Sequence, residues 1–261
     1  MNAVINGIHL GYDAIGGSGP PLVLIHGFGL DRSIWREMVF EYMPDQHVIL
    51  PDVRGHGESD APSRPYLMEE LADDLAGLLS ILHIDKAIVC GHSMGGYISL
   101  AFADLYPQRL LGLGLITTNA KADSDAKRKS RYRLIEQVRS HGSGELAKSL
   151  APRLSQNETI IKRAHALIAN TSPAGIMGSA RAMAERPHRM ALVQKVVLPV
   201  LVTAGEEDQI TDLADAMKLA VAFQNGRLLT FRNSGHMPMW ENPARLAEGI
   251  LDLIKRVSAA L

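Results

Sequence analysis

The sequence predicts an α/β fold, in which a mostly parallel, twisted sheet is flanked by helices and carries an inserted helical cap. Three observations favour this fold. Short apolar runs typical of buried strands alternate with helical patterns over residues 22–117 and again over 196–257. Only helical periodicity occurs between them, from Asn119 to about Pro187. Polar, glycine-rich loops follow the strands at their carboxyl ends, which is where ligands bind in open α/β sheets.

Length and composition limit the classes of partner. A chain of 261 residues is long enough to bury a sizeable apolar interior in one α/β domain with an inserted module. Its 27 basic and 28 acidic side chains nearly cancel, so charge gives no reason to expect binding to nucleic acid or to an anionic membrane. We therefore expect a small-molecule substrate, while the oligomeric state stays undetermined.

Two further features bear on the compartment and on metal binding. The single cysteine, Cys90, excludes an intrachain disulfide and a cysteine-rich metal site, and its apolar neighbours predict a core position. The N-terminus lacks a basic region followed by an apolar segment, and no uncharged apolar run approaches the length of a membrane span. These patterns predict a cytoplasmic protein.

Strand and helix patterns alternate through the first half of the chain. Residues 8–15 have a mostly period-two pattern, which predicts an antiparallel opening strand. Apolar runs predict further buried strands at 22–25, 47–50, 87–89 and 110–117. Helical spacing of apolar residues predicts helices near 34–42, 67–82 and 97–103.

The second half predicts a cap and then a return to the core. Within residues 119–187 the pair Ser172-Pro173 fits a helix N-cap followed by proline at the first helical position. We assign residues 119–187 to the cap, and residues 1–118 and 188–261 to the core. In the second core segment, strands are expected at 196–204 and 227–231, with helices starting at Asp212 and near Asn242.

The stretch from Cys90 to Gly96 carries the strongest signal for chemistry. Ser93 lies between Gly91 and Gly95, after an apolar strand pattern and before a helical one. Glycines at this spacing let a strand and a helix approach closely while the serine is held in a strained turn, as in a nucleophile elbow. The Ser93 hydroxyl and the N–H of Met94 are then expected to point the same way, at the carboxyl end of the strand.

A serine hydroxyl becomes a nucleophile only when a base takes its proton and a carboxylate fixes that base. Asp208 lies in the loop after one predicted strand, and His236 lies in the loop after the next. The chain order Ser93, Asp208, His236 is the order of α/β-hydrolase triads. The separation of Ser93 from Asp208 is wide enough to contain the predicted cap.

On these residues the sequence resembles the α/β-hydrolase superfamily over essentially its full length. The resemblance is carried by five motifs at the ends of predicted strands: His26-Gly27-Phe28-Gly29, Asp52-x-Arg54-Gly55-x-Gly57-x-Ser59, the elbow, Gly205-Glu206-Glu207-Asp208, and Gly235-His236 before Glu241-x-Pro243. Within the superfamily, Leu30-Asp31-x-Ser33-x-Trp35, the Gly-His-Ser-Met-Gly-Gly elbow and the cap length resemble small serine esterases and lactonases. β-Ketoadipate enol-lactonases and cofactor-free perhydrolases are examples.

The resemblance implies a mechanism for the cleavage of small carboxylic esters or lactones. Ser93 attacks the carbonyl, His236 transfers the proton, and Asp208 holds the imidazole. The backbone N–H groups of Phe28 and Met94 form the oxyanion hole. An acyl-enzyme on Ser93 is then hydrolysed by water, so neither a metal nor an organic cofactor is implied.

Rival residues exist for the base and for the acid. We expect His26 to brace its loop rather than act as the base, and we expect the side chain of His92 to face away from Ser93. Glu206 and Glu207 compete with Asp208, which the spacing from Gly205 favours.

The substrate pocket is predicted less directly. Met177, Met183 and Met237 are candidate substrate contacts, although packing against the sheet is the alternative for the methionines in the helical segment. The basic run in residues 127–133 is mixed with acidic residues and is typical of a solvated helix face. An anionic lactone would need a cation beside the pocket, for which Arg131, Arg153 and Arg181 are candidates.

Other functions share the same parts. A ligand-sensing protein of this fold would keep an intact triad and turn over slowly, and a perhydrolase or a carbon–carbon bond hydrolase would use the same triad on another acyl acceptor or bond. Fold alone does not decide among them.

Overall fold

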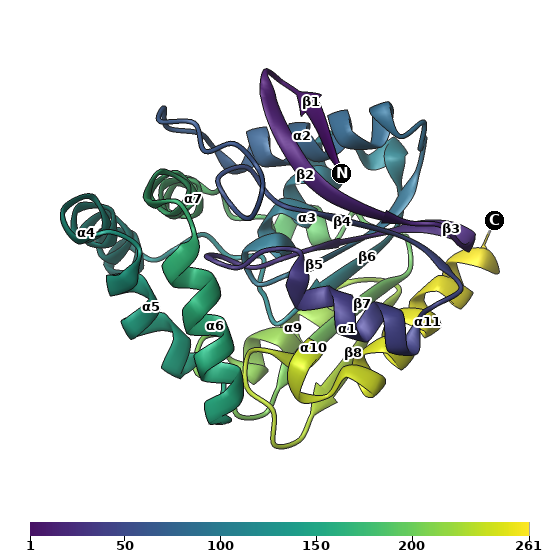
Figure 1. Ribbon diagram of the computed structural model, residues 1–261. Helices are drawn as coiled ribbons and strands as arrows, with labels where there is room; N and C mark the ends of the chain where they lie inside the picture. The colour runs from purple at the N-terminus through teal and green to yellow at the C-terminus, as the bar shows by residue number, and fades with distance from the viewer. Residues whose placement is uncertain (261) are drawn as a thin grey trace.

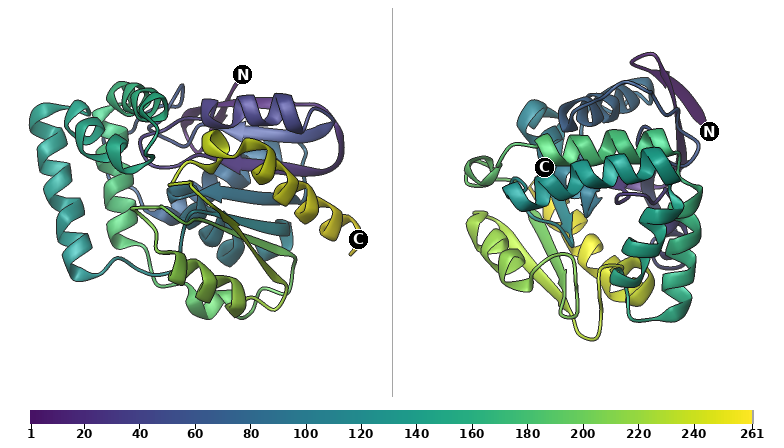
Figure 2. Two further views of the ribbon diagram at one scale, coloured as in Figure 1. Left: turned by 90° about the horizontal axis from the view of Figure 1, so that it is seen from below. Right: turned by 90° about the vertical axis from the view of Figure 1, so that its left-hand side faces the viewer.

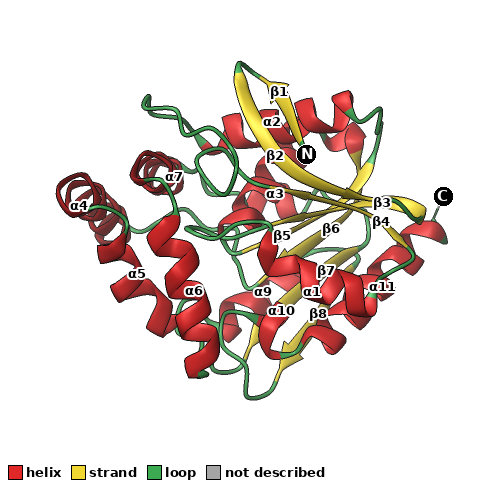
Figure 3. Cartoon of the chain, viewed as in Figure 1, coloured by secondary structure: helices red, strands yellow, loops and turns green. Residues whose placement is uncertain are grey.

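The computed structural model describes residues 1–260 and contains one eight-stranded sheet (Figures 1 and 3). The strands are β1 (Asn2–Ile5), β2 (Ile8–Ile15), β3 (Ser18–Ile25), β4 (Gln46–Pro51), β5 (Ala87–His92), β6 (Leu110–Ile116), β7 (Val200–Gly205) and β8 (Gly226–Phe231). Their order across the sheet is β1-β2-β4-β3-β5-β6-β7-β8. β2 is antiparallel to both of its neighbours, β1 and β4. From β4 across the sheet to β8, every neighbouring pair of strands is parallel. The predicted α/β fold with a mostly parallel sheet is confirmed.

Helices cover both faces of the sheet. The helices between and after the strands of the sheet are α1 (Ser33–Tyr42), α2 (Met68–Ile81), α3 (Met94–Leu105), α8 (Met190–Val193), α9 (Leu213–Ala222), α10 (Pro238–Glu241) and α11 (Pro243–Ser258). α1 packs against α11, and α2 packs against α3. Seen from below in the left panel of Figure 2, α1 and α11 lie above the sheet and α9 lies below it. The sheet is therefore the middle of three layers.

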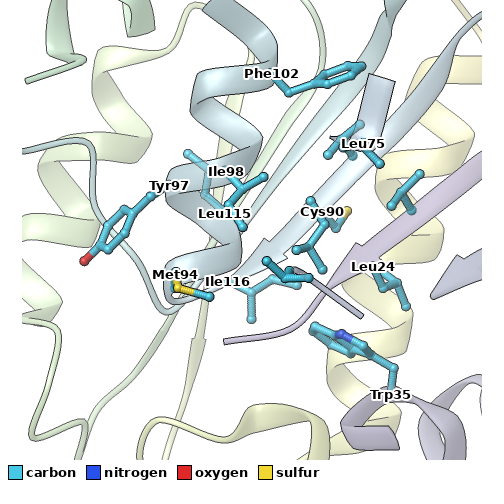
Figure 4. Close-up of a cluster of buried hydrophobic side chains, with 14 of the residues drawn as sticks. Leu24, Trp35, Leu75, Cys90, Met94, Tyr97, Ile98, Phe102, Leu115 and Ile116 are labelled. Atoms are coloured by element: carbon cyan, nitrogen blue, oxygen red, sulfur yellow. The ribbon is translucent and has the colours of Figure 1, made fainter. Parts of the chain in front are cut away.

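The core fills the space between these layers. Every residue of β5 and β7 is buried, as expected for parallel strands that are covered on both faces. Figure 4 shows Leu24 and Cys90 from adjacent strands, with the indole of Trp35 below them and Phe102 of α3 above. The predicted core position of Cys90 is confirmed, because its side chain is fully buried. This rigid centre fixes the ends of β3, β5 and β6, where functional loops begin.

The segment between β6 and β7 contains no strand within the described chain, as its periodicity predicts. Between β6 and α8 its helices are α4 (Asp125–His141), α5 (Gly144–Leu150), α6 (Glu158–Asn170) and α7 (Pro173–Glu185). Pro173 is at the first position of α7, as predicted. These four helices stand together at one end of the sheet, on the left of Figure 1 and away from the C-terminus. We call them the inserted helices.

Hydrogen bonds attach the inserted helices to core loops. The Tyr66 hydroxyl donates to the carbonyl of Gly175 at 3.1 Å and lies 3.0 Å from the Ser179 hydroxyl. Thr171 Oγ1 donates to the carbonyl of Gly29 at 2.9 Å. All these contacts are buried, so they fix the position of the inserted helices on the core.

Several element boundaries differ from the sequence-based expectations. β1, α8 and α10 were not predicted: β1 is a short edge strand with three of its four residues at least partly exposed, and the two helices have one turn each. β7 begins at Val200 rather than at 196, because Pro199 has no N–H to donate to a neighbouring strand. Within residues 1–260, none of the helices is both long and apolar enough to cross a lipid bilayer.

Candidate active site

Ser93 occupies a strained turn between β5 and α3. Its backbone angles are φ 53° and ψ −110°, a left-handed conformation that is costly for a residue with a side chain. The close approach around it depends on glycine. A Cβ on Gly91 would lie 2.0 Å from the carbonyl oxygen of Gly95, and a Cβ on Gly95 would lie 2.5 Å from that of Ile25. The predicted strand, sharp turn and helix are therefore present, with Ser93 at the apex.

Asp208 and His236 come together from the loops after β7 and β8. His236 Nδ1 lies 2.7 Å from Asp208 Oδ2, and both side chains are buried. The carboxylate also accepts hydrogen bonds from the Thr211 hydroxyl at 2.5 Å and from the N–H of Ile210 at 2.7 Å. Burial alone would raise the pKa of Asp208, but the imidazole and these donors together lower it to about 2. The carboxylate is therefore ionised at neutral pH, and it orients His236 with Nδ1 as a donor and Nε2 free.

The main chain of His236 is held on both sides. Its N–H donates to the carbonyl of Leu154, from the segment between α5 and α6, at 2.8 Å. Its carbonyl accepts hydrogen bonds from His92 Nε2 at 2.8 Å and from Thr117 Oγ1 at 3.3 Å. These contacts tie the His236 loop to β5, to the end of β6 and to the inserted helices.

Ser93 and His236 line one cavity of about 630 Å³ between the sheet and the inserted helices. Phe28, Tyr97 and Met183 also contribute to its walls. Among the hydrogen bonds of residues 1–260, none joins Ser93 Oγ to His236 Nε2. Catalytic hydrogen bonds are often long without substrate and shorten when substrate binds. The structure thus brings all three predicted triad positions to one place, with the closest contact between Asp208 and His236.

Two backbone N–H groups, those of Phe28 and Met94, have no acceptor among the hydrogen bonds of residues 1–260. Met94 is the first residue of α3, so its N–H has no acceptor within the helix. Phe28 follows β3 and lines the cavity, and none of the hydrogen bonds described for residues 1–260 is donated by its N–H. Both groups are thus free to bind an external acceptor.

Three further histidines lie close by, and each is buried. His26 Nε2 accepts from the N–H of Val53 at 2.9 Å, which confirms its predicted bracing role. Burial lowers the pKa of His26, and it lowers those of His56 and His92 to about 3. These three rings are therefore neutral at physiological pH.

One expectation for these histidines was wrong. The side chain of His92 does not face away from the site, because its ring lies 4.9 Å from that of His236 and lines the same cavity. Its Nδ1 is buried without a hydrogen-bond partner within residues 1–260. Nothing in the spacing of residues distinguishes this inward orientation from the outward one.

The rivals of Asp208 lie away from the base. Glu206 and Glu207 are exposed, and neither shares a hydrogen bond with His236 in the part of the chain that is described. Their carboxylates remain in solvent, whereas that of Asp208 is directed inward.

The methionines have different positions. Met183 of α7 lines the cavity, whereas Met177 and Met237 do not. Met177 precedes Met183 by six residues, which places the two side chains about 120° apart around the helix. Met237 is fully buried in the core. A contact between either residue and a ligand in this cavity is therefore not supported.

Basic residues, by contrast, reach the cavity. Arg131 and Arg153 line it, whereas Arg181 is exposed on α7 and does not. Lys127 and Arg133 also line it, so the helix face expected to be simply solvated faces the site in part. No cluster of three or more His, Cys, Asp or Glu side chains within residues 1–260 is arranged to hold a metal ion.

Comparisons with known proteins agree with this geometry. The sequence profile of the family described as alpha/beta hydrolase fold matches residues 20–243. The chain is 29% identical over 243 residues to 3-oxoadipate enol-lactonase 2 of Acinetobacter baylyi, covering 91% of this chain and 89% of that protein. Among solved structures it is similar to a thermophilic esterase from Thermogutta terrifontis, at 34% identity, a TM-score of 0.93 and 98% coverage of both chains. It is also similar to the enol-lactonase from Burkholderia xenovorans LB400, at 26% identity and a TM-score of 0.89, covering 98% of this chain and 100% of that one.

Proposed function

The chain belongs to the α/β-hydrolase family, and from this premise we propose that it is a serine hydrolase that cleaves small carboxylic esters or lactones. It is an esterase-like and enol-lactonase-like hydrolase by its relatives. The finer proposal, that Ser93, His236 and Asp208 form the catalytic triad, is supported above all by one observation. The buried pair of His236 and Asp208 shares a cavity with a serine at the apex of a nucleophile elbow.

In the first half of the reaction, Ser93 Oγ attacks the carbonyl carbon of the substrate. His236 Nε2 takes the hydroxyl proton, and the negative charge of Asp208 stabilises the imidazolium that forms. The carbonyl oxygen becomes an oxyanion, which accepts hydrogen bonds from the N–H groups of Phe28 and Met94. His236 then gives its proton to the departing alkoxide oxygen, which leaves an acyl-enzyme and an alcohol. With a lactone, the alcohol stays attached to the acyl group.

In the second half, water replaces the alcohol. His236 takes a proton from water, the hydroxide adds to the acyl carbon, and the oxyanion forms again beneath the same two N–H groups. Collapse of this intermediate breaks the bond to Ser93 Oγ, and His236 returns the proton to Ser93. The product is a carboxylic acid, and the enzyme is restored.

The inserted helices have a role in this proposal. Residues 119–187 form a cap that covers the cavity on the side opposite the core, and the core comprises residues 1–118 and 188–261. Leu30, Tyr97 and His236 lie on the core side of the cavity, whereas Leu134, Leu146 and Met183 come from the inserted helices. A substrate between the two is shielded from bulk water, which strengthens hydrogen bonds to the oxyanion.

The test is steady-state hydrolysis of a short-chain p-nitrophenyl ester and of a small lactone. Ser93→Ala should lower kcat/KM by several orders of magnitude, as triad knockouts do. Ser99→Ala is the matched control. It removes a hydroxyl from α3, the helix that follows Ser93, and this hydroxyl bonds only to the carbonyl of Gly95. If Ser93→Ala retained substantial activity on both substrates, the proposal would be wrong.

A further inference from the structure

The cavity beside Ser93 has an excess of positive charge. Four basic side chains line it, and none of its lining residues is acidic: the basic residues are Lys127, Arg131, Arg133 and Arg153. The molecule as a whole has a net charge of −1, so this concentration is local and does not follow from composition. Charges of one sign in a cleft with low-dielectric walls attract ligands of the other sign.

Arg131 is the most firmly held of these cations. Its side chain is 18% exposed, compared with 49% for Arg128 on the same helix. Nε lies 3.2 Å from Asp123 Oδ2, and the guanidinium carbon lies 5.9 Å from the centre of the Phe28 ring. In the hydrogen bonds described for residues 1–260, neither Nη1 nor Nη2 of Arg131 takes part. Two donors of a planar guanidinium thus remain available, the arrangement that binds a carboxylate through two parallel hydrogen bonds.

Asp123 fixes Arg131 without cancelling the charge of the region. Its carboxylate is fully buried and is shared with Arg186, whose Nη1 lies 2.8 Å from Asp123 Oδ1. Lys127 Nζ lies 3.9 Å from the same oxygen. One negative charge therefore faces three positive charges, which leaves the region cationic.

Arg153 reaches the cavity from a different element. It lies between α5 and α6, and its Nη2 donates to the carbonyl of Gln209 at 2.9 Å. No carboxylate lies within ion-pair distance of Arg153 among the described residues, so its charge is not compensated by an ion pair. The Gln209 contact places it beside the loop that carries Asp208.

The remaining walls of the cavity combine apolar side chains with a few uncharged polar ones, such as Ser130 and Gln137. Phe28, Leu30, Leu134 and Leu150 line the same cavity as the cations and Ser93. Such a surface suits a short carbon chain that joins a reacting ester group to a charged end. A wholly apolar substrate would leave the guanidinium donors without partners once water is excluded, which is unfavourable.

We infer that the site selects esters or lactones that carry a second, ionised carboxylate, and that Arg131 and Arg153 bind this carboxylate. This inference rests on the proposed function and adds the substrate class to it. Lys127 and Arg133 contribute to the attraction of the anion.

The test compares each anionic ester with a neutral ester of the same shape. Monomethyl succinate, glutarate and adipate place a carboxylate in the acyl part, and the corresponding amides replace it with a neutral group of similar size. The acetate esters of glycolate and 3-hydroxypropanoate, with their amides, place it in the alcohol part. We expect kcat/KM of the wild type for the best carboxylate to exceed that for its amide by about tenfold or more.

The variants Arg131→Gln and Arg153→Gln should each reduce this preference, and the double variant should reduce it to about one. Arg139→Gln is the matched control, because Arg139 lies on α4, pairs with Glu136 and does not line the cavity. It removes the same net charge and should leave the preference unchanged. Lack of preference in both sets of esters, or a preference that persists in the double variant, would overturn the inference.

Calorimetric titration with glutarate separates this inference from the proposed function. Glutarate has no ester bond, so its binding does not depend on turnover. We expect saturable binding to the wild type that weakens about tenfold or more in the double variant. Binding of glutarate to a protein that hydrolyses no ester would support the anion site and contradict the hydrolase. Ester hydrolysis without glutarate binding would support the hydrolase and contradict the anion site.

Discussion

The Nε2 atom of His92 lies 2.8 Å from the main-chain carbonyl oxygen of His236, although the two residues are 144 positions apart in the chain. Since a carbonyl only accepts hydrogen bonds, Nε2 of His92 is the protonated nitrogen. The neutral state of the His92 ring agrees with this tautomer, because burial lowers its pKa to about 3. His92 is therefore a positioning residue for the proposed base, and its own proton is not expected to move during the reaction.

This contact predicts different effects for two substitutions of His92. His92→Leu removes the donor and should lower kcat by roughly tenfold or more, with a smaller effect on KM, because the His236 loop loses one of its anchors. His92→Gln retains an N–H donor and should restore a large part of the loss. Steady-state kinetics of both variants on one ester measures this. Equal activity in the two variants would show that the hydrogen bond has no positioning role.

Replacement of Asp208 by asparagine should lower the activity without changing the fold. Asp208→Asn removes the negative charge that stabilises the imidazolium, and kcat should fall by about 10⁴-fold, as in other triads. The substitution keeps the size of the side chain, so circular dichroism should show an unchanged fold. A variant with near-normal kcat would contradict the role of Asp208.

The stability effect of Asp208 depends on pH in a defined direction. The pKa of Asp208 is lowered in the folded state to about 2, so the ionised form stabilises the fold at pH values above the unfolded pKa of about 4. This contribution, of about 2 kcal/mol, is lost as the pH falls from about 4 to about 2. Urea unfolding at several pH values should therefore show a difference between wild type and Asp208→Asn that shrinks across this range. A difference that grows with acidity would contradict the assigned ionisation.

The close packing at the elbow predicts that alanine substitution lowers stability strongly at one glycine, Gly91, and not at another, Gly144. In Gly91→Ala the new methyl group would lie 2.0 Å from the backbone oxygen of Gly95, and its nearest neighbours are all backbone atoms rather than the ends of flexible side chains. We expect a loss of about 2 kcal/mol or more in the free energy of unfolding, together with loss of activity. Gly144→Ala is the control, because a Cβ there has no neighbour within 4 Å and φ is not in the left-handed region. It should be neutral or slightly stabilising in the same denaturation experiment.

Tyr66 links the inserted helices to the core and offers a further test. Burial raises the pKa of Tyr66 to about 12, so the hydroxyl is neutral and donates to Gly175 or Ser179. Tyr66→Phe removes both buried hydrogen bonds of the hydroxyl and should reduce the free energy of unfolding by about 1–3 kcal/mol. Tyr12→Phe is the control, since within residues 1–260 the buried Tyr12 makes no hydrogen bond through its hydroxyl. If the free energy of unfolding fell by the same amount in both variants, the hydrogen bonds of Tyr66 would not contribute to stability.

The fold and the positions of the proposed triad residues were predictable for the same physical reason. Strand periodicity and glycine spacing are local properties, and they mark where a parallel strand ends and a loop begins. Ser93, Asp208 and His236 each follow such an end, and the carboxyl ends of parallel strands meet at one edge of the sheet. Convergence of these three residues therefore requires no detailed knowledge of side-chain packing.

The walls of the cavity were harder to predict because they depend on the orientation of helices relative to the sheet. Met177 and Met183 both suit an apolar lining, but only the direction of α7 decides which one faces the cavity. In the sequence, Arg131 belongs to a basic run that is typical of a solvated helix face. Its inward position depends on Asp123, whose carboxylate also pairs with Arg186, 55 residues further along the chain than Arg131. Such tertiary ion pairs leave no periodic signal.

The identity of the nucleophile is measured most directly by covalent labelling with diisopropyl fluorophosphate, which reacts with activated serine hydroxyls. Peptide mass spectrometry should find one adduct per chain, on Ser93, and His236→Ala should label more slowly by orders of magnitude because the proton acceptor is missing. A label on another residue, or equal rates of labelling in wild type and His236→Ala, would contradict the account.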